Sequence, residues 1–407
     1  MAEQLRLHTF ALPDESDFRL TNHLPPQPTV FIRGGDGLVG AGVAAKLSAT
    51  GPNRIAELAV KWRALVASAE VIDEVQRPGT GLIAFGSFAF ADDSQDESVL
   101  IVPRVVLGTR DGKRWVTRVA GGDDANFWDE PQQYSINSAV AFGDGAQSAK
   151  GFAASVTNAV SRIASGELEK VVLARDLVAN VDEDFDLRPA LHKFAEKYPT
   201  CWTYSVDGLF GASPELLVRV AHKQVSARVL AGTAARGTDP DVDYAISNAL
   251  SNSPKNVAEH RFAVASLVEQ LQKFCTTVDA DTEPFSLQLP NLGHLASDVH
   301  GVLNDDASAL DLAAVLHPTA AVAGTPTATA LRVISEIEPF DRGRYAGPVG
   351  WLGADGDGEW AIALRGAQLR NGKITAFAGC GIVAESDPES ELEETELKLR
   401  PIREALS

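Results

Sequence analysis

The stretches that favour β-strands come in runs, without a regular alternation of strand and helix, and this order most constrains the fold. Branched and aromatic residues predict strands at 29–33, 81–85 and 99–107. The turn Asp111-Gly112 connects the last of these to a strand at 114–119, which predicts a β-hairpin. Strands joined in this way pair antiparallel, whereas a parallel sheet needs a long crossover between neighbouring strands. The sequence therefore predicts an α+β fold and not a doubly wound sheet.

The remaining elements continue this irregular order to the end of the chain. Apolar spacing and end signals predict helices at 53–69, 149–165, 241–274 with an interruption near Pro254, and from about Pro388 onward. Further strands are predicted at 170–175, 216–220, 347–351, 360–365 and 374–378.

A polar stretch rich in Gly, Asp and Gln, at 121–145, lies between the hairpin and the second predicted helix. Such composition is typical of a connection and not of a packed element. We therefore divide the chain into an N-terminal part at 1–125, a linker at 126–148 and a C-terminal region at 149–407. The 407 residues are nevertheless expected to form one compact structural domain overall.

Charge and composition exclude several classes of partner. A net charge of −19 repels nucleic acid and anionic lipid, so neither is an expected partner. No apolar run approaches the roughly 18 residues of a membrane span, and the first residues lack a signal-peptide pattern. The three cysteines are far apart in the sequence, which predicts reduced thiols in a cytoplasmic protein and excludes a cysteine-rich zinc site.

The segment Gly35–Gly40 matches the glycine fingerprint of dinucleotide-binding proteins, and it follows a predicted strand. That fingerprint also needs a second strand that ends in an acidic residue about 20 positions later. Here this distance falls inside the helical stretch around Glu57. We interpret the glycines as a turn between a strand and a helix.

Lys170 and Glu215 are the candidate acid–base groups. Lys170 begins an apolar strand, whose alternation places it on one face with Val172 and Ala174. Desolvation on a buried face would lower the lysine pKa and make the amine usable as a base. Glu215 stands just before the strand at 216–220, where partial burial would raise its pKa and suit a general acid. Taken alone, each residue is more often a solvated group at a strand end.

Glu391, Glu394 and Lys398 are spaced three and four residues apart in the last predicted helix, so they share one face. With Glu259 from another helix, the carboxylates would form an oxygen-ligand site of the kind that suits Mg²⁺. The alternative is a solvated helix face, since the stretch 389–396 holds five glutamates in eight residues.

The glycines of Gly379-Cys380-Gly381 follow the predicted strand at 374–378. Without side chains at two of three positions, their backbone amides could approach a ligand carboxylate. Arg365 ends the neighbouring predicted strand and could bind the same carboxylate in a fork. The alternative is a tight turn between core elements.

Together and in this order, these segments resemble the chorismate-utilising enzymes, a family that includes isochorismate, anthranilate, aminodeoxychorismate and salicylate synthases. The resemblance runs from Lys170 to Lys398 and includes Leu230–Thr233, His317-Pro318-Thr319, Glu338–Arg342 and Tyr345–Trp351. It implies large antiparallel sheets packed as a sandwich, with helices outside and one active site. It also implies that residues 1–125 are a scaffold and that residues 149–407 form the chorismate-binding catalytic region.

The resemblance implies a role for each matching residue. Lys170 resembles the base that activates water, and Glu215 the acid that protonates the leaving hydroxyl. Glu259 and Glu394 resemble Mg²⁺ ligands, with Glu391 close by. The expected substrate-binding residues are Gly232, Thr233, His317, Ala321, Tyr345, Arg365, Gly379, Cys380, Gly381 and Lys398.

Lys170 and Ala321 favour water over ammonia as the nucleophile, because ammonia-using relatives have other residues at both places. The chain also has no amidotransferase region, so no amidotransferase subunit is expected and a monomer is the simplest state. Chorismate is thus the expected substrate and isochorismate the expected product. A salicylate synthase, or a chorismate-binding protein without activity, remains as an alternative. Cys380 replaces a usual alanine, so we expect its alkylation to lower activity.

Overall fold

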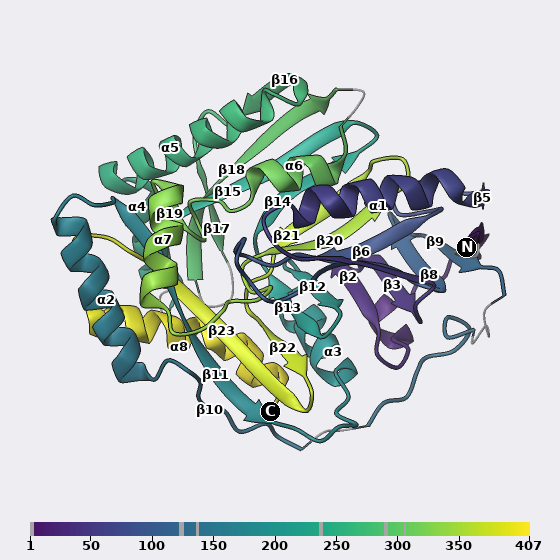
Figure 1. The fold of residues 1–407 in the computed structure, drawn as a ribbon, viewed down its shortest axis with the longest axis horizontal. Coiled ribbons are helices and arrows are strands. Elements are labelled where there is room, and N and C mark those ends of the chain that lie inside the picture. Colours follow the sequence, from purple (N-terminus) through teal and green to yellow (C-terminus); the bar gives the residue numbers. More distant parts are fainter. Residues whose placement is uncertain (1–3, 122–125, 136–137, 236–238, 289–291, 305–306) are drawn as a thin grey trace.

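The computed structural model describes residues 4–121, 126–135, 138–235, 239–288, 292–304 and 307–407 (Figure 1). Side chains of a few further residues, among them Gly232, Thr233 and Glu259, are outside this description. The described strands form two sheets, sheet A and sheet B. All strand pairs in them are antiparallel except the edge pair β1 and β5, which confirms the predicted antiparallel architecture.

In spatial order, sheet A consists of β10 (Gly143–Asp144), β11 (Lys170–Asn180), β23 (Lys373–Ile382), β22 (Gly366–Arg370), β13 (Leu209–Ser213), β12 (Trp202–Val206), β2 (Thr29–Arg33), β3 (Asp36–Ala41), β8 (Val105–Arg110), β9 (Lys113–Val119), β1 (Arg6–Leu12) and β5 (Glu70–Asp73), with β19 (Gly324–Thr325) beside β11. Sheet B consists of β16 (Cys275–Ala280), β18 (Leu292–Leu303), β15 (Gln224–Ala235), β14 (Leu216–Ala221), β21 (Gly358–Ile362), β20 (Pro348–Gly353), β6 (Ile83–Ser87), β7 (Ser98–Val102) and β4 (Ala45–Ala49), with β17 (Phe285–Gln288) beside β18.

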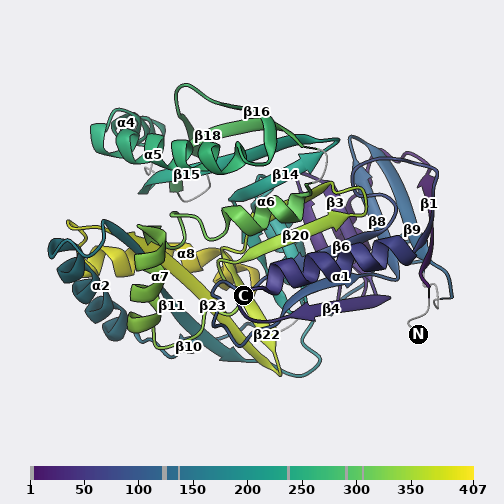
Figure 2. The same ribbon diagram turned by 45° about the horizontal axis from the view of Figure 1, so that its top comes forward.

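The helices lie on the outer faces of the two sheets (Figures 1 and 2). On sheet B, α1 (Arg54–Ser68) packs beside α6 (Ala309–Leu316), and α4 (Pro240–Ser251) and α5 (Pro254–Leu271) pack on β15 and β18. On sheet A, α3 (Arg188–Lys197) packs on β12 and β13, and α8 (Pro388–Ala405) packs on β23. Finally, α2 (Ala149–Ala164) and α7 (Thr327–Ile337) cover β11. The predicted α+β sandwich with helices outside is confirmed.

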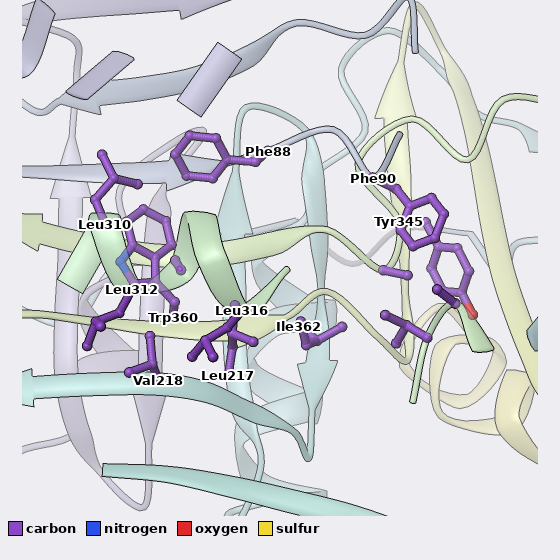
Figure 3. Packing of buried hydrophobic residues seen from close by; sticks show 14 of the residues in the cluster. Phe88, Phe90, Leu217, Val218, Leu310, Leu312, Leu316, Tyr345, Trp360 and Ile362 are labelled. Atoms are coloured by element: carbon purple, nitrogen blue, oxygen red, sulfur yellow. The ribbon is translucent and has the colours of Figure 1, made fainter. Parts of the chain in front are cut away.

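Three apolar layers hold this arrangement together, since each sheet buries both of its faces. Between the sheets, side chains of sheet A such as Trp115 and Trp202 pack against those of sheet B such as Phe85 and Trp351. A second cluster fills the space between sheet A and helices α3 and α8. The third covers the outside of sheet B, where Figure 3 shows three leucines of α6 over Val218 and Trp360, and it extends to β11 with helices α2 and α7.

Two of the predictions for the N-terminal third are wrong in detail. The strand expected at 99–107 is two strands, because Pro103 has no N–H to donate and the chain passes there from β7 in sheet B to β8 in sheet A. The glycine segment 35–40 begins in the turn of a hairpin and continues as strand β3, which pairs with β2, so it does not lead into a helix. Gly34 and Gly35 form its turn with positive φ angles of 61° and 92°.

Parts of the expected linker pack against the rest of the protein. Phe127 and Trp128 are buried in the cluster beneath sheet A, and the Val140 N–H donates to the Leu406 carbonyl oxygen. Both sheets also combine strands from before and after this segment. This arrangement supports one structural unit, while the functional division at residues 125 and 148 stays a prediction.

Candidate active site

The site is built where two neighbouring strands cross together from one sheet to the other. The chain leaves sheet A after β13 and enters sheet B as β14, and on the way back it leaves β21 and enters β22. The two connections are bonded to each other, because the Ile362 N–H donates to the Glu215 carbonyl oxygen at 3.0 Å and the Ser213 hydroxyl donates to the Ile362 carbonyl oxygen at 2.5 Å. Glu215 lies on the outward connection and Arg365 on the returning one.

Glu215 is buried, with 9% of its surface exposed. This burial raises the pKa of its carboxyl to about 7, although the positive charges of Arg365, Lys170 and Lys398 oppose the shift. A carboxyl with this pKa is partly protonated at neutral pH and can donate a proton. The same three cations show that the site is locally positive in a strongly acidic chain. The site is therefore suited to an anionic ligand.

Arg365 adopts a left-handed backbone conformation, with a φ angle of 52° that is uncommon for a residue with a side chain. Burial lowers the pKa of its guanidinium, while the nearby Tyr345, Cys201, Glu394 and Glu215 act to raise it. Even with a lowered pKa, an arginine remains charged near neutral pH. Arg365 is thus a partly desolvated cation without a bidentate carboxylate partner among the described residues.

Tyr345 is buried beside Arg365, and its ring stacks on Phe377 with centroids 5.0 Å apart. Burial raises the pKa of the Tyr345 hydroxyl to about 12, so the hydroxyl stays protonated and can donate a hydrogen bond. An ideal Cβ placed on Gly379 would lie 3.3 Å from this hydroxyl. Arg365, Tyr345 and the Gly379 backbone, expected together from the sequence, are therefore neighbours in the structure.

Lys170 is the first residue of β11, which lies between β23 and the short strand β19. An ideal Cβ on Gly381 would lie 2.8 Å from the Lys170 Cε and 3.6 Å from its Nζ. The lysine side chain therefore extends over Gly381, across the surface that this glycine leaves open. Only glycine at position 381 permits this path without displacing the side chain.

A buried ion pair fixes the strand that carries Lys170. Glu338 and Arg342 bind each other through two hydrogen bonds of 2.6 and 2.8 Å. Arg342 also donates to the carbonyl oxygen of Val172, and Glu338 accepts from the N–H of Ala174. A buried pair with these additional bonds holds β11 in one position, since every polar group finds a partner.

Cys380 lies on the other face of β23 from its two glycine neighbours, because side chains alternate along a strand. Its thiol contacts the Glu391 carbonyl oxygen at 3.7 Å, in α8, and only 1% of the residue is exposed. Burial raises the pKa of this thiol well above its usual value. The Cys380 side chain therefore faces α8, and the part of Cys380 expected to bind the substrate, its backbone, stays a prediction.

Helix α8 brings Lys398 and two glutamates to the end of β23. The Lys398 ammonium donates to the Gly379 carbonyl oxygen at 2.8 Å and forms an ion pair with Glu394 at 2.5 Å. Glu391, one turn earlier, accepts from the Ser386 hydroxyl at 2.6 Å. The predicted common face of the helix is confirmed by the pair at positions 394 and 398, and it is not simply a solvated surface because 89% of the Lys398 side chain is buried.

His317 follows α6, and its ring contacts a backbone carbonyl from the N-terminal third of the chain. Its Nε2 lies 3.1 Å from the Phe90 carbonyl oxygen, and Arg54 donates to the same oxygen at 3.3 Å. Burial lowers the pKa of His317 to about 4, so the ring is neutral near pH 7. Since a carbonyl can only accept, Nε2 carries the hydrogen and Nδ1 is an acceptor. Nδ1 is buried without a partner among the described residues.

A family model for the chorismate binding enzymes matches residues 22–407, which is nearly the whole chain. The chain belongs to the chorismate-binding enzyme family.

Individual relatives are similar over most of the length of this chorismate-binding enzyme. Isochorismate synthase MenF of Bacillus subtilis is 32% identical over 363 residues, which cover 82% of this chain and 76% of that protein. The solved structure of MenF, the menaquinone-specific isochorismate synthase from Escherichia coli, is similar with a TM-score of 0.80 at 25% identity, over 99% of this chain and 95% of that chain. A putative 2,3-dihydroxybenzoate-specific isochorismate synthase, DhbC from Bacillus anthracis, has a TM-score of 0.77 at 28% identity over 95% and 98% of the two chains.

For three expected site residues of this chorismate-binding enzyme, only the backbone is described. The backbone of Gly232 and Thr233 lies in β15 and that of Glu259 in α5, but their side chains lie outside the described residues. Ala321 is partly buried in the connection between α6 and β19. Within the part of the chain that is described, no helix is long and apolar enough to cross a membrane.

Several residues that shape the site were not singled out individually by sequence reasoning. Glu338 and Arg342 were noticed only as part of a matching segment, although their spacing of four residues is a signal for a helical or turn pair. Phe90 contacts His317 through its backbone carbonyl oxygen, and a contact of the backbone cannot be predicted from the residue type. Tyr204 reaches the site from the middle of sheet A, which only the strand order shows.

Proposed function

We propose that the protein isomerises chorismate to isochorismate in a magnesium-dependent reaction. The observation that carries this proposal is the burial of Glu215, with a pKa of about 7, among the charges of Lys170, Arg365 and Lys398. An exchange of hydroxyl groups on a dicarboxylate requires an acid and a base at one anion-binding site. A carboxyl that is partly protonated at neutral pH and a lysine beside it meet this requirement. Its solved and curated relatives named above, all isochorismate synthases, support the same reaction.

In the proposed mechanism, Lys170 is the base and Glu215 is the acid. Lys170 takes a proton from water as the water oxygen bonds to ring carbon 2. Both ring double bonds shift by one position, the bond from carbon 4 to its hydroxyl oxygen breaks, and Glu215 donates the proton with which that hydroxyl leaves as water. One water enters and one leaves, so substrate and product are isomers. General acid and general base each contribute about 10²- to 10⁴-fold in such reactions.

The two substrate carboxylates have separate partners in this proposal. Arg365, the Tyr345 hydroxyl and the backbone of residues 379–381 would bind the enolpyruvyl carboxylate, since they adjoin one another. Lys398 would lie beside the ring carboxylate. Gly232 and Thr233 would form the floor beneath the ring, with Ala321 nearby, and the Nδ1 of His317 would accept a hydrogen bond from a polar group near the ring.

Mg²⁺ would be held by Glu259 and Glu394, with Glu391 close to it. The donor set fits, because carboxylate oxygens are hard ligands and Mg²⁺ uses few protein ligands beside water and substrate oxygens. Among the described residues no group of three potential ligand side chains forms a complete metal site, and the side chain of Glu259 is not among them. When bound, the metal would neutralise a substrate carboxylate and fix its orientation.

A product assay tests this proposal directly. Purified protein is incubated with chorismate and Mg²⁺, and the products are separated by chromatography. We expect isochorismate as the single product. Salicylate with pyruvate would instead support the salicylate synthase alternative, and binding of chorismate without any product would support a non-catalytic binding protein. We further propose a cytoplasmic, monomeric enzyme without an amidotransferase subunit. Its product would serve menaquinone or siderophore synthesis, and the solved relatives named above are menaquinone-specific and 2,3-dihydroxybenzoate-specific.

A further inference from the structure

We propose that Tyr204 is the positioning residue that holds Arg365 in its productive conformation. This inference rests on the proposed function, in which Arg365 binds a substrate carboxylate. Tyr204 is fully buried in β12, and its hydroxyl donates a 3.0 Å hydrogen bond to the carbonyl oxygen of Leu364. Leu364 immediately precedes Arg365, so this bond fixes the orientation of the peptide group between the two residues. The φ angle of Arg365 is measured from that peptide group.

The second peptide plane at Arg365 is also bonded. Its own carbonyl oxygen accepts from the N–H of Ala212 in β13, at a longer distance of 3.4 Å. The residue between the two planes has a φ angle of 52°, a conformation that side-chain-bearing residues adopt only when their surroundings impose it. The shorter of the two flanking bonds, from the Tyr204 hydroxyl, is therefore the stronger constraint on the backbone from which the Arg365 side chain extends.

The sheet provides a path for the Tyr204 side chain across two glycines. Tyr204 pairs with Gly211 on β13, and Gly211 pairs with Gly366 on β22, so the three residues lie in one row across three strands. An ideal Cβ on Gly211 would lie 2.6 Å from the Tyr204 hydroxyl oxygen, and one on Gly366 would be closer still. Both glycines therefore leave the space through which the hydroxyl reaches Leu364.

The hydroxyl remains a donor under all working conditions. Burial raises the pKa of Tyr204 far above its usual value, and the nearby Tyr345 adds to this shift while Arg365 opposes it. Tyr204 does not touch the substrate in this scheme. It acts through Arg365, and its removal should weaken substrate binding more than it slows the chemical step, because Arg365 binds a carboxylate that does not react.

The test compares Tyr204→Phe in two backgrounds. Tyr204→Phe keeps the ring and removes only the hydroxyl, and we expect the KM for chorismate to rise roughly 5- to 20-fold with kcat changed less than threefold. Arg365→Gly removes the guanidinium while glycine tolerates the positive φ angle, and we expect it to raise KM further. In the Arg365→Gly background, Tyr204→Phe should then have no additional effect on KM.

A matched control is Tyr198→Phe, which removes the hydroxyl of another buried tyrosine, located at the end of α3. It should leave KM unchanged, and thermal unfolding of all variants separates loss of folded protein from loss of binding. An unchanged KM in Tyr204→Phe, or an equal rise in both backgrounds, would overturn the role of Tyr204 while leaving the proposed reaction intact. An unchanged KM in Arg365→Gly would instead overturn the carboxylate site, and with it this inference.

Discussion

The side chain of Lys170 extends over Gly381, so that a methyl group at position 381 would lie 2.8 Å from the lysine Cε. Gly381→Ala should therefore displace the amine without touching any reacting group. We expect kcat to fall roughly 10- to 100-fold, since small displacements of a catalytic group have effects of this size. The control is Gly143→Ala in β10 of the same sheet, where an added Cβ meets nothing within 4 Å. A kcat within twofold of the parent enzyme in Gly381→Ala would contradict this path of the lysine.

Replacing the base should abolish turnover while leaving the ligand site intact. For Lys170→Ala we expect a loss of about 10²- to 10⁴-fold in kcat, the range for a general base. Chorismate should still bind in the presence of Mg²⁺, which titration calorimetry can measure. Lys150→Ala, on the exposed surface of α2, serves as the control. Normal turnover by Lys170→Ala would refute the assignment of the base.

If Glu215 is the acid, its raised pKa of about 7 predicts a pH-dependent rate. An acid must be protonated to donate, so kcat/KM should decline as the pH rises through about 7. Glu215→Gln should lower kcat about 10²- to 10⁴-fold and remove this limb of the profile. A parent profile that stays level up to pH 9 would argue against a rate-limiting donation by Glu215.

The same pKa shift also predicts how stability depends on pH. Between about pH 4.5 and 7 the unfolded chain has lost the Glu215 proton while the folded chain keeps it. Stability should therefore decrease with rising pH in this window, because the folded state binds more protons. Chemical denaturation at several pH values would show a smaller decrease in Glu215→Gln than in the parent. The same slope in both proteins would speak against a protonated Glu215 in the folded state.

Cys380 should be unreactive in the folded protein, contrary to what the sequence alone suggested. Its thiol is 1% exposed, faces α8 and has a pKa raised well above its usual value, so little thiolate forms. We expect N-ethylmaleimide to leave activity unchanged and mass spectrometry to find Cys380 unmodified until the protein is unfolded. Rapid modification of native Cys380 with loss of activity, prevented by bound product, would restore the earlier expectation.

Removal of Mg²⁺ by a chelator should abolish activity, and added Mg²⁺ should restore it. Glu394→Gln should raise the Mg²⁺ concentration for half-maximal rate roughly 10- to 100-fold, as expected when a carboxylate that supports a metal is lost. Glu393→Gln, at the exposed neighbouring position in α8, provides the control. Full activity in the chelator-treated enzyme would contradict the magnesium proposal.

Much of the fold could be predicted because its signals are local. The hairpin at Asp111-Gly112, the helix ending before Gly166 and the break before Pro254 all depend on a few adjacent residues. The crossing at Pro103 could not be predicted, because the residues on both sides are branched and apolar and predict strand equally well. Which sheet a strand joins depends on distant partners, and a local pattern does not contain them.

In the site, too, local contacts could be predicted from the sequence and contacts between distant residues could not. The spacing of Glu394 and Lys398 predicted that they share one helix face, and the structure shows an ion pair between them there. The proximity of Lys170 to Glu215 followed only from the resemblance, because one begins β11 and the other lies on the connection between β13 and β14. The hydrogen bond from Tyr204 to Leu364 spans 160 residues of sequence and depends on two glycines in two further strands. Contacts of this kind are a result of strand order and need the folded structure.

The paired crossing between the sheets joins two parts of the candidate site through the backbone. Glu215 stands on the connection from β13 to β14, and Arg365 on the connection from β21 to β22. Hydrogen bonds from Ile362 to Glu215 and from Ser213 to Ile362 hold these two connections together. The proposed acid and the proposed carboxylate-binding cation therefore belong to one rigid piece of backbone. A substitution that loosened either connection would disturb both groups at once, although neither side chain had been changed.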